Sequence, residues 1–487
     1  MMIEHRQLFI DGQWGRPATD EVLEVRSPST EELIGRVPAV STLDVDRAVT
    51  AARSAFDTGA WPTLTPHERA DYLRAVRKGL LARGDEIAEV LAAEAGLPVK
   101  LWARVEMGLP FIDYFVELAE GFEFEELRTG PSSDVLVRRE PIGVVAAILP
   151  FNAPLNIALM KIVPALLAGC TVVFKPDPNT PLHSFILAEI VHEAGLPPGV
   201  INFVPAQRES SLALVAHQGV DHVSFTGSSA TGRIVGGVCG SQLKRCTLEL
   251  GGKSAAIVLD DVDLSAVLPV LAGSGFMNNG EACVLQSRVL APRRRYSEIV
   301  EAFTTVAASL STGDPHDLQT DVGPLITESH RERVEGFVTR GVRAGAQVAV
   351  GGSRPRGLEK GWYFEPTILS NVENGMEVAQ EEIFGPVVSI IPYDDDAQAV
   401  ALANDSAYGL SGTVWTADYS RGHHIATQVR TGNFGINTFG MDPCAPFGGW
   451  KQSGLGYELG REGFEEFLAT KSVHVPMDWK DKAKGRS

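Results

Sequence analysis

A cysteine and a glutamate, each set among glycines, point most directly to chemistry. Cys283 ends the segment Gly280–Cys283, and Glu249 begins the segment Glu249–Ser254, which contains two adjacent glycines. A thiol on a polar loop of small residues is placed to ionise as an exposed thiolate, the nucleophilic form of cysteine. A carboxylate at a buried strand end has its pKa raised by desolvation, which suits a general base. The pair predicts covalent catalysis followed by activation of water, against the plainer alternatives of a structural cysteine and a solvated carboxylate.

Polar groups also follow other predicted strands. Asn152 comes just after the apolar run 143–149, where its amide would stabilise an oxyanion or simply form a turn. The segment Phe225–Ser228 lies between a predicted strand and a predicted helix, and Lys175 directly follows another strand. Glycine and a helix N-terminus at such a point suit a phosphate. This turn lacks the usual GxGxxG fingerprint, so nucleotide binding and ordinary strand–turn–helix punctuation remain alternatives here.

The other cysteines are weaker candidates. Cys170, Cys239 and Cys246 lie in apolar or helical context and are interpreted as structural, whereas Cys444 lies on a loop and is a rival nucleophile. The five cysteines are far apart and show no ligand spacing, so neither a disulfide framework nor a metal site is expected. Few cysteines in odd number fit a reducing compartment.

Length and charge narrow the class of protein. The chain has 487 residues, enough for two or three domains with large cores. Its formal net charge of −18 argues against non-specific binding to nucleic acid or to an anionic membrane. The N-terminus has no apolar signal core, and the apolar runs are too short to span a bilayer. A cytoplasmic enzyme is expected.

Helices and strands that would carry these residues alternate along most of the chain. Residues 8–14 predict a hairpin with Asp-Gly at its turn, and Thr65–Glu68 is a capping box that opens a helix. From residue 141 to 250, apolar runs typical of buried strands alternate with helical segments. The same alternation resumes at residue 255 and continues to about residue 436. Two sheets covered by helices are therefore predicted.

Seven segments, in the same order along the chain, resemble the aldehyde dehydrogenase superfamily from about residue 8 to the C-terminus. Each segment alone is weak, but their order over the full length is hard to reach by chance. They are Pro150–Asn152, Lys175–Pro176, Phe225–Ser228, Glu249–Ser254, Gly280–Cys283, Glu381–Val387 and Pro446–Gly454.

The resemblance implies an α/β fold with a Rossmann-like cofactor domain, a second α/β catalytic domain and a small β extension for oligomerisation. In this sequence the cofactor-binding domain would comprise residues 1–121 and 142–250, and the catalytic domain residues 251–467. Segments 122–141 and 468–487 would form the extension, because strand addition between subunits satisfies open sheet edges. A homo-oligomer, dimer or tetramer, is expected.

The resemblance also assigns catalytic roles. Cys283 would attack an aldehyde carbonyl, and the oxyanion would be held by the Asn152 side chain and the backbone N–H of Cys283. After hydride transfer leaves a thioester, Glu249 would activate water and release the carboxylic acid. Lys161 and Glu458 would relay the proton away from this base. No metal is expected to take part.

A nicotinamide cofactor follows from the same resemblance. Lys175 would contact the adenosine ribose, Ser228 the pyrophosphate and Glu382 the nicotinamide ribose. Pro178 stands where many NAD-using members have glutamate, which removes a ribose hydrogen bond and also a repulsion against a 2′-phosphate. NAD is therefore expected, with NADP left open. The expected cofactor-binding residues are Phe151, Lys175, Pro178, Gly227, Ser228, Glu382 and Phe384.

The substrate tunnel implied by the resemblance is mostly apolar and uncharged. The matching stretches contain no arginine to pair with a substrate carboxylate. A neutral, apolar aldehyde, aliphatic or aromatic, is therefore favoured over a dicarboxylic semialdehyde, with a core role as the alternative for some of these side chains. The expected substrate-contacting residues are Met107, Phe111, Asn156, Met160, Ala282, Val284, Met441 and Phe447.

Two other functions and one residue stay open. A CoA-acylating relative would pass the acyl group to CoA instead of water, but such relatives generally lack a base like Glu249. A non-catalytic binding or structural protein with the same fold would not need Cys283, Glu249 and Asn152 together. Glu281 stands where glutamine is common, so its carboxylate would either raise the pKa of the nearby thiol or face elsewhere.

Overall fold

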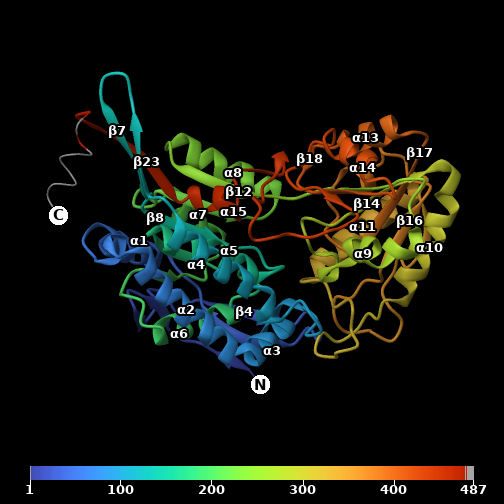
Figure 1. Ribbon diagram of the computed structural model, residues 1–487. Coiled ribbons are helices and arrows are strands. Elements are labelled where there is room, and N and C mark those ends of the chain that lie inside the picture. The colour runs from blue at the N-terminus through green and yellow to red at the C-terminus, as the bar shows by residue number, and fades with distance from the viewer. Residues whose placement is uncertain (1, 478, 480–487) are drawn as a thin grey trace.

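A computed structural model describes residues 2–477 and 479. It contains two α/β bodies, each built on its own sheet, and a β arm that projects from the first body (Figure 1). Among these described residues, no helix combines the length and the apolar character needed to cross a membrane. The alternation of strands and helices expected from residue 141 onward is present in both bodies.

The first body is built on a six-stranded sheet with the order β10-β9-β8-β11-β12-β22. Its strands pair in parallel except the last, which runs antiparallel to β12. All five residues of β8 and of β9 are buried, as expected for strands covered on both faces. The strands are β8 (Val144–Ile148), β9 (Thr171–Lys175), β10 (Ile201–Phe203), β11 (His222–Thr226), β12 (Arg245–Glu249) and β22 (Gly454–Leu455).

Helices cover both faces of this sheet, and the N-terminal strands pack beside it. The predicted capping box at Thr65 is present, and the predicted hairpin pairs Leu8–Ile10 with Gln13–Gly15. The helices are α1 (Thr42–Asp57), α2 (Pro66–Ala82), α3 (Gly84–Ala95), α4 (Leu109–Gly121), α5 (Pro154–Ala168), α6 (Leu182–Glu193), α7 (Arg208–Ala216), α8 (Ser229–Ser241) and α15 (Gly460–Glu465). The small strands are β1 (Ile3–Glu4), β2 (Leu8–Ile10), β3 (Gln13–Gly15), β4 (Val22–Arg26) and β5 (Leu33–Pro38).

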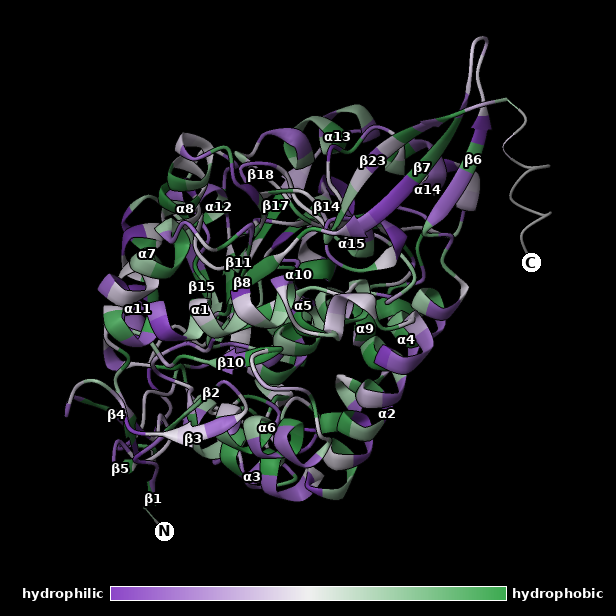
Figure 2. Ribbon diagram, turned by 90° about the vertical axis from the view of Figure 1, so that its left-hand side faces the viewer, coloured by the Kyte–Doolittle hydropathy of each residue, from purple (hydrophilic) through white to green (hydrophobic). Residues whose placement is uncertain are grey.

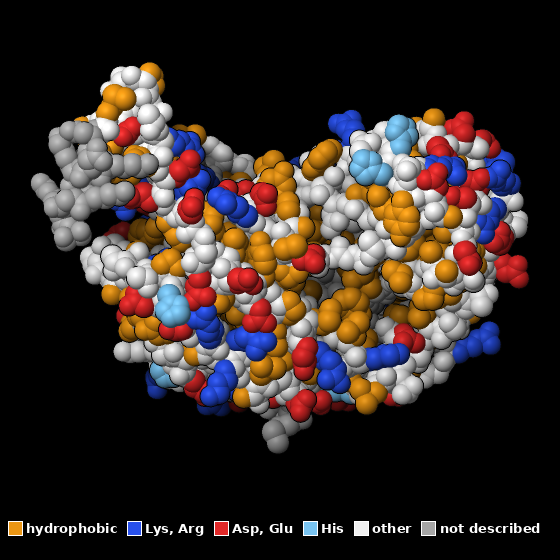
Figure 3. All heavy atoms as spheres, viewed as in Figure 1, with side chains coloured by type: hydrophobic (Ala, Val, Ile, Leu, Met, Phe, Trp, Pro, Cys, Tyr) orange, Lys and Arg blue, Asp and Glu red, His pale blue; other side chains and the backbone are white. Residues whose placement is uncertain are grey.

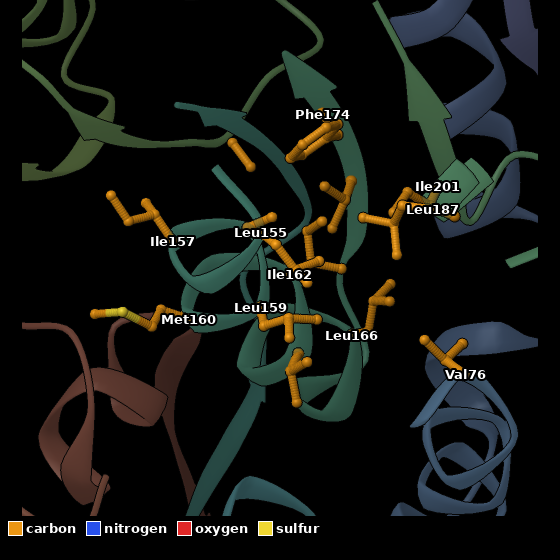
Figure 4. Close-up of a cluster of buried hydrophobic side chains, with 14 of the residues drawn as sticks. Val76, Leu155, Ile157, Leu159, Met160, Ile162, Leu166, Phe174, Leu187 and Ile201 are labelled. Atoms are coloured by element: carbon orange, nitrogen blue, oxygen red, sulfur yellow. The ribbon is translucent and has the colours of Figure 1, made fainter. Parts of the chain in front are cut away.

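Helix α5 lies at the centre of the first body and is hydrophobic on nearly every side. A helix that is apolar all round is a buried helix. Pro154 occupies its first turn, and Gly169 ends it in the left-handed region with φ of 96°. Figure 4 shows that Ile157 and Met160 point away from the side of α5 that carries Leu166. One side of the helix therefore fills the core while another is available to the site described below.

The second body is built on a seven-stranded sheet with the order β15-β16-β17-β14-β13-β19-β20. Its strands are β13 (Ala255–Val258), β14 (Arg288–Pro292), β15 (Gln347–Val350), β16 (Thr367–Ser370), β17 (Val387–Tyr393), β19 (Gly412–Trp415) and β20 (Gly435–Ile436). Its helices are α9 (Leu264–Phe276), α10 (Tyr296–Ser309), α11 (Glu328–Arg343), α12 (Glu377–Gln380), α13 (Asp396–Asn404) and α14 (Tyr419–Ala426). A short ladder joins β18 (Tyr408–Gly409) to β21 (Trp450–Lys451). The 3-10 turns of the chain are Trp61–Thr63, Val105–Met107, Asn278–Gly280 and Arg293–Arg295.

The β arm consists of β6 (Glu125–Thr129), β7 (Asp134–Pro141) and β23 (Leu468–Val475). The central strand β7 pairs antiparallel with β23 along its full length, from Leu468 opposite Pro141 to Val475 opposite Asp134. Figure 2 shows the β6–β7 hairpin standing clear of the body. The predicted terminal strand is therefore present and starts three residues earlier than residue 471. Residues 478 and 480–487 of the expected 468–487 segment lie outside the described residues.

The C-terminal part of the chain returns to the first body before it enters the arm. Strand β22 completes the first sheet, and α15 packs against α5. Leu459, Phe464 and Phe467 belong to the same hydrophobic cluster as α5. These side chains therefore bury their apolar surface in the core of the first body.

Candidate active site

The loop that carries Cys283 makes a sharp turn stabilised by two asparagines. Asn278, Asn279 and Gly280 have φ values of 52°, 59° and 77°, all in the left-handed region, which asparagine and glycine tolerate best. The side-chain amide of Asn279 donates to the carbonyl of Gly96 at 2.9 Å and accepts from the N–H of Gly323 at 2.7 Å. These bonds fix the backbone from which Cys283 projects.

Cys283 is half-buried rather than exposed. Burial raises the pKa of its thiol, and the charges of Glu382, Glu249 and Glu458 raise that pKa further. The expectation of an exposed thiolate is therefore wrong, because desolvation favours the neutral thiol in this position. A base or a bound cation must act before this sulfur becomes a strong nucleophile.

The side-chain amide of Asn152 and the backbone N–H of Cys283 are both available as hydrogen-bond donors. Asn152 is 7% exposed, and its side-chain nitrogen donates one hydrogen bond, at 2.7 Å, to the carbonyl of Glu281. That bond fixes the amide and leaves its second N–H for another acceptor. Within the described chain, no carbonyl accepts the backbone N–H of Cys283. The two donors have the character of an oxyanion hole.

Glu249 ends β12 and is 3% exposed. No donor from the described residues reaches either of its carboxylate oxygens. Burial raises the pKa of Glu249 well above its ordinary value, Glu458 raises it further, and Lys161 acts in the opposite direction. The predicted strand-end carboxylate is thus desolvated and has free lone pairs, which is what a general base for water requires.

Lys161 and Glu458 form a buried ion pair behind this base. Lys161 projects from α5 and is fully buried, and Glu458 is 4% exposed and follows β22. The Lys161 ammonium also donates to Ser224 Oγ at 3.0 Å. The sequence expected these two residues to act together, and the structure brings them into direct contact across 297 positions of the chain.

A cavity of about 310 Å³ opens next to the thiol between the two bodies. Figure 3 shows hydrophobic side chains bordering the hollow on the face between them. Five of the expected cofactor residues lie in the lining together with Cys283 and Asn152. The lining residues are Pro150, Phe151, Asn152, Ile157, Thr226, Gly227, Ser228, Leu250, Gly251, Cys283, His330, Arg333, Glu382 and Phe384.

The remaining two expected cofactor residues, Lys175 and Pro178, are outside this lining. Lys175 is 7% exposed, and burial lowers its pKa while the nearby Asp177 acts in the opposite direction. Asp177 thus provides a carboxylate next to Pro178 and near the ammonium of Lys175. Ser228 caps α8 by accepting from the N–H of Thr231, so the N-terminus of this helix faces the cavity edge.

Glu382 and Phe384 belong to a short loop before β17. Glu382 Oε1 accepts from the N–H of Gly252 at 2.9 Å, and burial raises the pKa of Glu382 to about 7. A Cβ added at Gly251 would lie 2.2 Å from Glu382 Oε2, so glycine is required for this approach. Phe384 has φ of 61°, an uncommon conformation for a bulky residue. The loop is therefore held in place by its surroundings.

The expected substrate residues divide into two groups. Phe111, Met160 and Phe447 are 4–6% exposed and belong to the hydrophobic cluster of the first body. These three side chains therefore contribute to the core. Met441 is 40% exposed. The four others, Met107, Asn156, Ala282 and Val284, are half-buried.

The carboxylate of Glu281 faces α11 rather than the thiol. Its Oε1 accepts from the N–H of Ile326 at 3.0 Å and lies 3.5 Å from His330 Nε2. Burial raises the pKa of Glu281, and Glu281 is not among the charges that shift the pKa of Cys283. The open question from the sequence is therefore answered in favour of a role on the far side of the loop.

His330 and Arg333 line the cavity and were missed by sequence reasoning. They lie three residues apart on α11, so they share one face of that helix. This spacing was readable in the sequence, but many exposed helices carry such pairs. Nothing in the sequence alone connected this face to the cavity.

Residues 14–473 match the model of the aldehyde dehydrogenase family. Geranial dehydrogenase of Castellaniella defragrans is 45% identical, covering 98% of this chain and all of the relative. The 3-succinoylsemialdehyde-pyridine dehydrogenase of a Pseudomonas species is 40% identical, covering 97% of this chain and 99% of the relative.

Solved structures agree with the fold over nearly the whole chain. An aldehyde dehydrogenase of Mycobacterium tuberculosis complexed with NAD+ has a TM-score of 0.96 and 49% identity, covering 98% of this chain and 99% of that one. A mutant of aldehyde dehydrogenase C from Pseudomonas syringae, complexed with NAD+ and octanal, has a TM-score of 0.93 and 37% identity, covering 96% of each chain.

Proposed function

The chain belongs to the aldehyde dehydrogenase family, and on this premise we propose that it oxidises neutral, apolar aldehydes to carboxylic acids with NAD. The observation that carries the proposal is the cavity itself. It brings Cys283 and Asn152 together with Glu382 and Phe384, while the desolvated Glu249 lies at the end of the adjacent strand. In this proposal Cys283 would be the nucleophile, Asn152 the oxyanion donor and Glu249 the base, with Glu382 and Phe384 beside the cofactor.

The residues around the cavity fit a nicotinamide dinucleotide. Ser228 presents the N-terminus of the 13-residue helix α8, which suits a pyrophosphate. Glu382 offers a carboxylate for ribose hydroxyls, and Gly251 leaves room for that carboxylate. Solved relatives that hold NAD+ support NAD as the cofactor. The bound nicotinamide would supply a hydride acceptor. The first body would bind the cofactor and the second would carry the thiol.

The protein's own residues would perform the acyl steps. Cys283 would give its thiol proton to Glu249, which would pass it toward Lys161 and Glu458. The sulfur would then attack the aldehyde carbon, and the oxyanion would accept from Asn152 and from the N–H of Cys283. Once the hydride has left, a thioester remains on the sulfur. Glu249 takes a proton from water, which attacks the thioester and releases the acid. Lys161 and Glu458, in contact behind the base, would pass that proton on.

A neutral, apolar aldehyde fits both the surroundings and the relatives. Cys283 and Val284 pack against the hydrophobic cluster of the first body, which contains Phe111, Met160 and Phe447. Relatives are named for geranial and for a pyridine semialdehyde, and one solved relative holds octanal. The one arginine in the described lining, Arg333, already donates to the carbonyls of Ile383 and Glu382, so burying the carboxylate of a dicarboxylic semialdehyde here would be unfavourable.

The proposal also covers assembly and location. In the described part of the chain, β23 and β6 are the outer strands of the arm, and their outer edges suit strand addition, which supports a homodimer or homotetramer. All five cysteines are unpaired, which supports a reducing, cytoplasmic location. Light scattering of the purified chain measures the mass of the assembly, and a monomer would contradict this part.

The test is an assay of NADH formation with octanal and geranial, without CoA, combined with detection of the acid. We expect turnover in the wild type and none in Cys283→Ala, whereas NAD still binds the variant. NADH and acyl-CoA formed only after addition of CoA, without free acid, would instead support an acyl-CoA-forming enzyme. If neither NAD nor NADP were reduced with any aldehyde, a non-catalytic protein would be the better description.

A further inference from the structure

One face of α11 holds three consecutive backbone carbonyls of the loop that lines the cavity. His330 Nε2 donates to the carbonyl of Phe384 at 2.6 Å. The guanidinium of Arg333 donates to the two preceding carbonyls, to Ile383 at 2.5 Å and to Glu382 at 2.6 Å. Two side chains thus bind three successive peptide units. We call His330 and Arg333 the α11 clamp.

The segment that the clamp holds is strained and functionally placed. Phe384 has φ of 61°, a conformation that a bulky residue keeps only where its surroundings over-determine it. Its ring lies 5.9 Å from the His330 ring and 5.9 Å from the Phe151 ring, centroid to centroid. Both rings contact the same cavity as Cys283. The clamp therefore fixes the Phe384 side of the cavity, where the planar ring of a bound ligand would pack.

The same end of α11 is also bound to the loop that carries the nucleophile. Glu281, two residues before Cys283, accepts from the N–H of Ile326, which directly precedes the N-cap residue Thr327 of α11. Its carboxylate lies 3.5 Å from His330 Nε2. A Cβ at Gly280 would lie 2.1 Å from the backbone of Gly385 and Pro386, so the two loops touch. The N-terminal end of α11 is thus bound to both the Cys283 loop and the Glu382–Phe384 loop, and it sets the distance between them.

We propose that His330 and Arg333 are positioning residues for hydride transfer, which hold the Glu382–Phe384 loop at a fixed distance from Cys283. This inference rests on the proposed function, because it assigns the loop to the nicotinamide side of the cavity. Reaction rates depend steeply on such spacing, since a displacement of about 1 Å can cost on the order of 10²-fold. Glu281 supports the clamp from the side of the thiol.

The variants His330→Leu and Arg333→Lys test the clamp. His330→Leu removes the hydrogen bond to the carbonyl of Phe384. Arg333→Lys keeps the positive charge but replaces the planar guanidinium, which donates to two carbonyls, by a single ammonium group. His330→Gln retains an N–H donor and is the conservative rescue. Arg343→Leu, an exposed change at the far end of the same helix, is the matched control.

Single-turnover kinetics with enzyme in excess over octanal and with saturating NAD measure the hydride step directly. We expect His330→Leu to lower the rate constant on the order of 10²-fold and Arg333→Lys about tenfold. His330→Gln and Arg343→Leu should remain within about threefold of the wild type. A fluorescence titration with NAD alone should show weaker binding in His330→Leu and Arg333→Lys.

Two results would overturn the inference. One is a rate constant and an NAD affinity within about threefold of the wild type in both clamp variants. The other is a loss of amplitude only, with an unchanged rate constant, which describes fewer folded molecules rather than a displaced loop. If the wild type itself fails to oxidise octanal, the proposed function fails, and the NAD titration still tests the clamp.

Discussion

Replacing Gly252 by alanine should separate the active-site loops without unfolding the protein. A Cβ at this position would lie 2.4 Å from the backbone carbonyl oxygen of Cys283, whereas carbon and oxygen atoms ordinarily approach to about 3.3 Å. The obstructing atom belongs to the backbone, so a rotamer change cannot relieve the contact. The Cys283 loop or the Gly252 segment must therefore move by roughly 1 Å.

Such a displacement acts on two partners at once. The N–H of Gly252 donates to Glu382 Oε1 at 2.9 Å, and Cys283 carries the thiol. Because a misplacement of about 1 Å costs on the order of 10²-fold, kcat/KM for octanal should fall by about that factor in Gly252→Ala. The KM for NAD should rise as well, since Glu382 loses its partner.

The matched control is Gly237→Ala. Gly237 lies in α8, and a Cβ there would meet no atom within 4 Å. Alanine in a helix is favoured over glycine by roughly 0.5–1 kcal/mol, so this variant should be slightly more stable and equally active. Steady-state kinetics and thermal unfolding of both variants provide the measurements. A kcat/KM for Gly252→Ala within about threefold of the wild type, with normal stability, would refute the reasoning from contact distance.

Three further outcomes are expected. Glu249→Gln should slow thioester hydrolysis more than hydride transfer, so the pre-steady-state NADH burst should persist. In the wild type, hydrolysis should accelerate as the pH rises through the raised pKa of Glu249, and the variant should lose this increase with pH. Lys161→Met should destabilise the protein by about 3–5 kcal/mol in urea denaturation, because it leaves a buried carboxylate unpaired, and adding Glu458→Leu should recover most of the loss. Burial lowers the pKa of His222 to about 3, so the unfolded chain binds a proton there before the folded chain does; stability should fall by roughly 1.4 kcal/mol per pH unit as pH decreases from about 6 toward 3, and His222→Gln should flatten that slope.

Local sequence signals predicted the elements of the fold well. The apolar run at 143–149 and the strand predicted before Lys175 are buried on both faces, and the capping box at Thr65 opens α2. These features depend on short-range patterns, namely buried strands and caps, that the sequence carries by itself. The two sheets and their helices followed from alternation of such patterns.

Long-range packing was less accessible. The return of β22 and α15 to the first body was not foreseen, because a two-residue strand has no periodic pattern. The half-burial of Cys283 was also missed, because flanking polar residues suggested solvent while the loop is in fact covered by distant segments. His330 and Arg333 escaped notice for the same reason, since their partners are about fifty residues away.

The ion pair between Lys161 and Glu458 has a consequence for the order in which the protein folds. Chains fold in part while they are synthesised, N-terminal segments first. The first five strands of the first sheet precede residue 250, yet the carboxylate that neutralises the buried ammonium of Lys161 arrives 297 residues after it. Until then, closing α5 into its core would bury an unpaired charge. Although most of the first body is synthesised first, its core can close fully only after Glu458 has been synthesised, near the end of the chain. The active site is therefore completed late in folding.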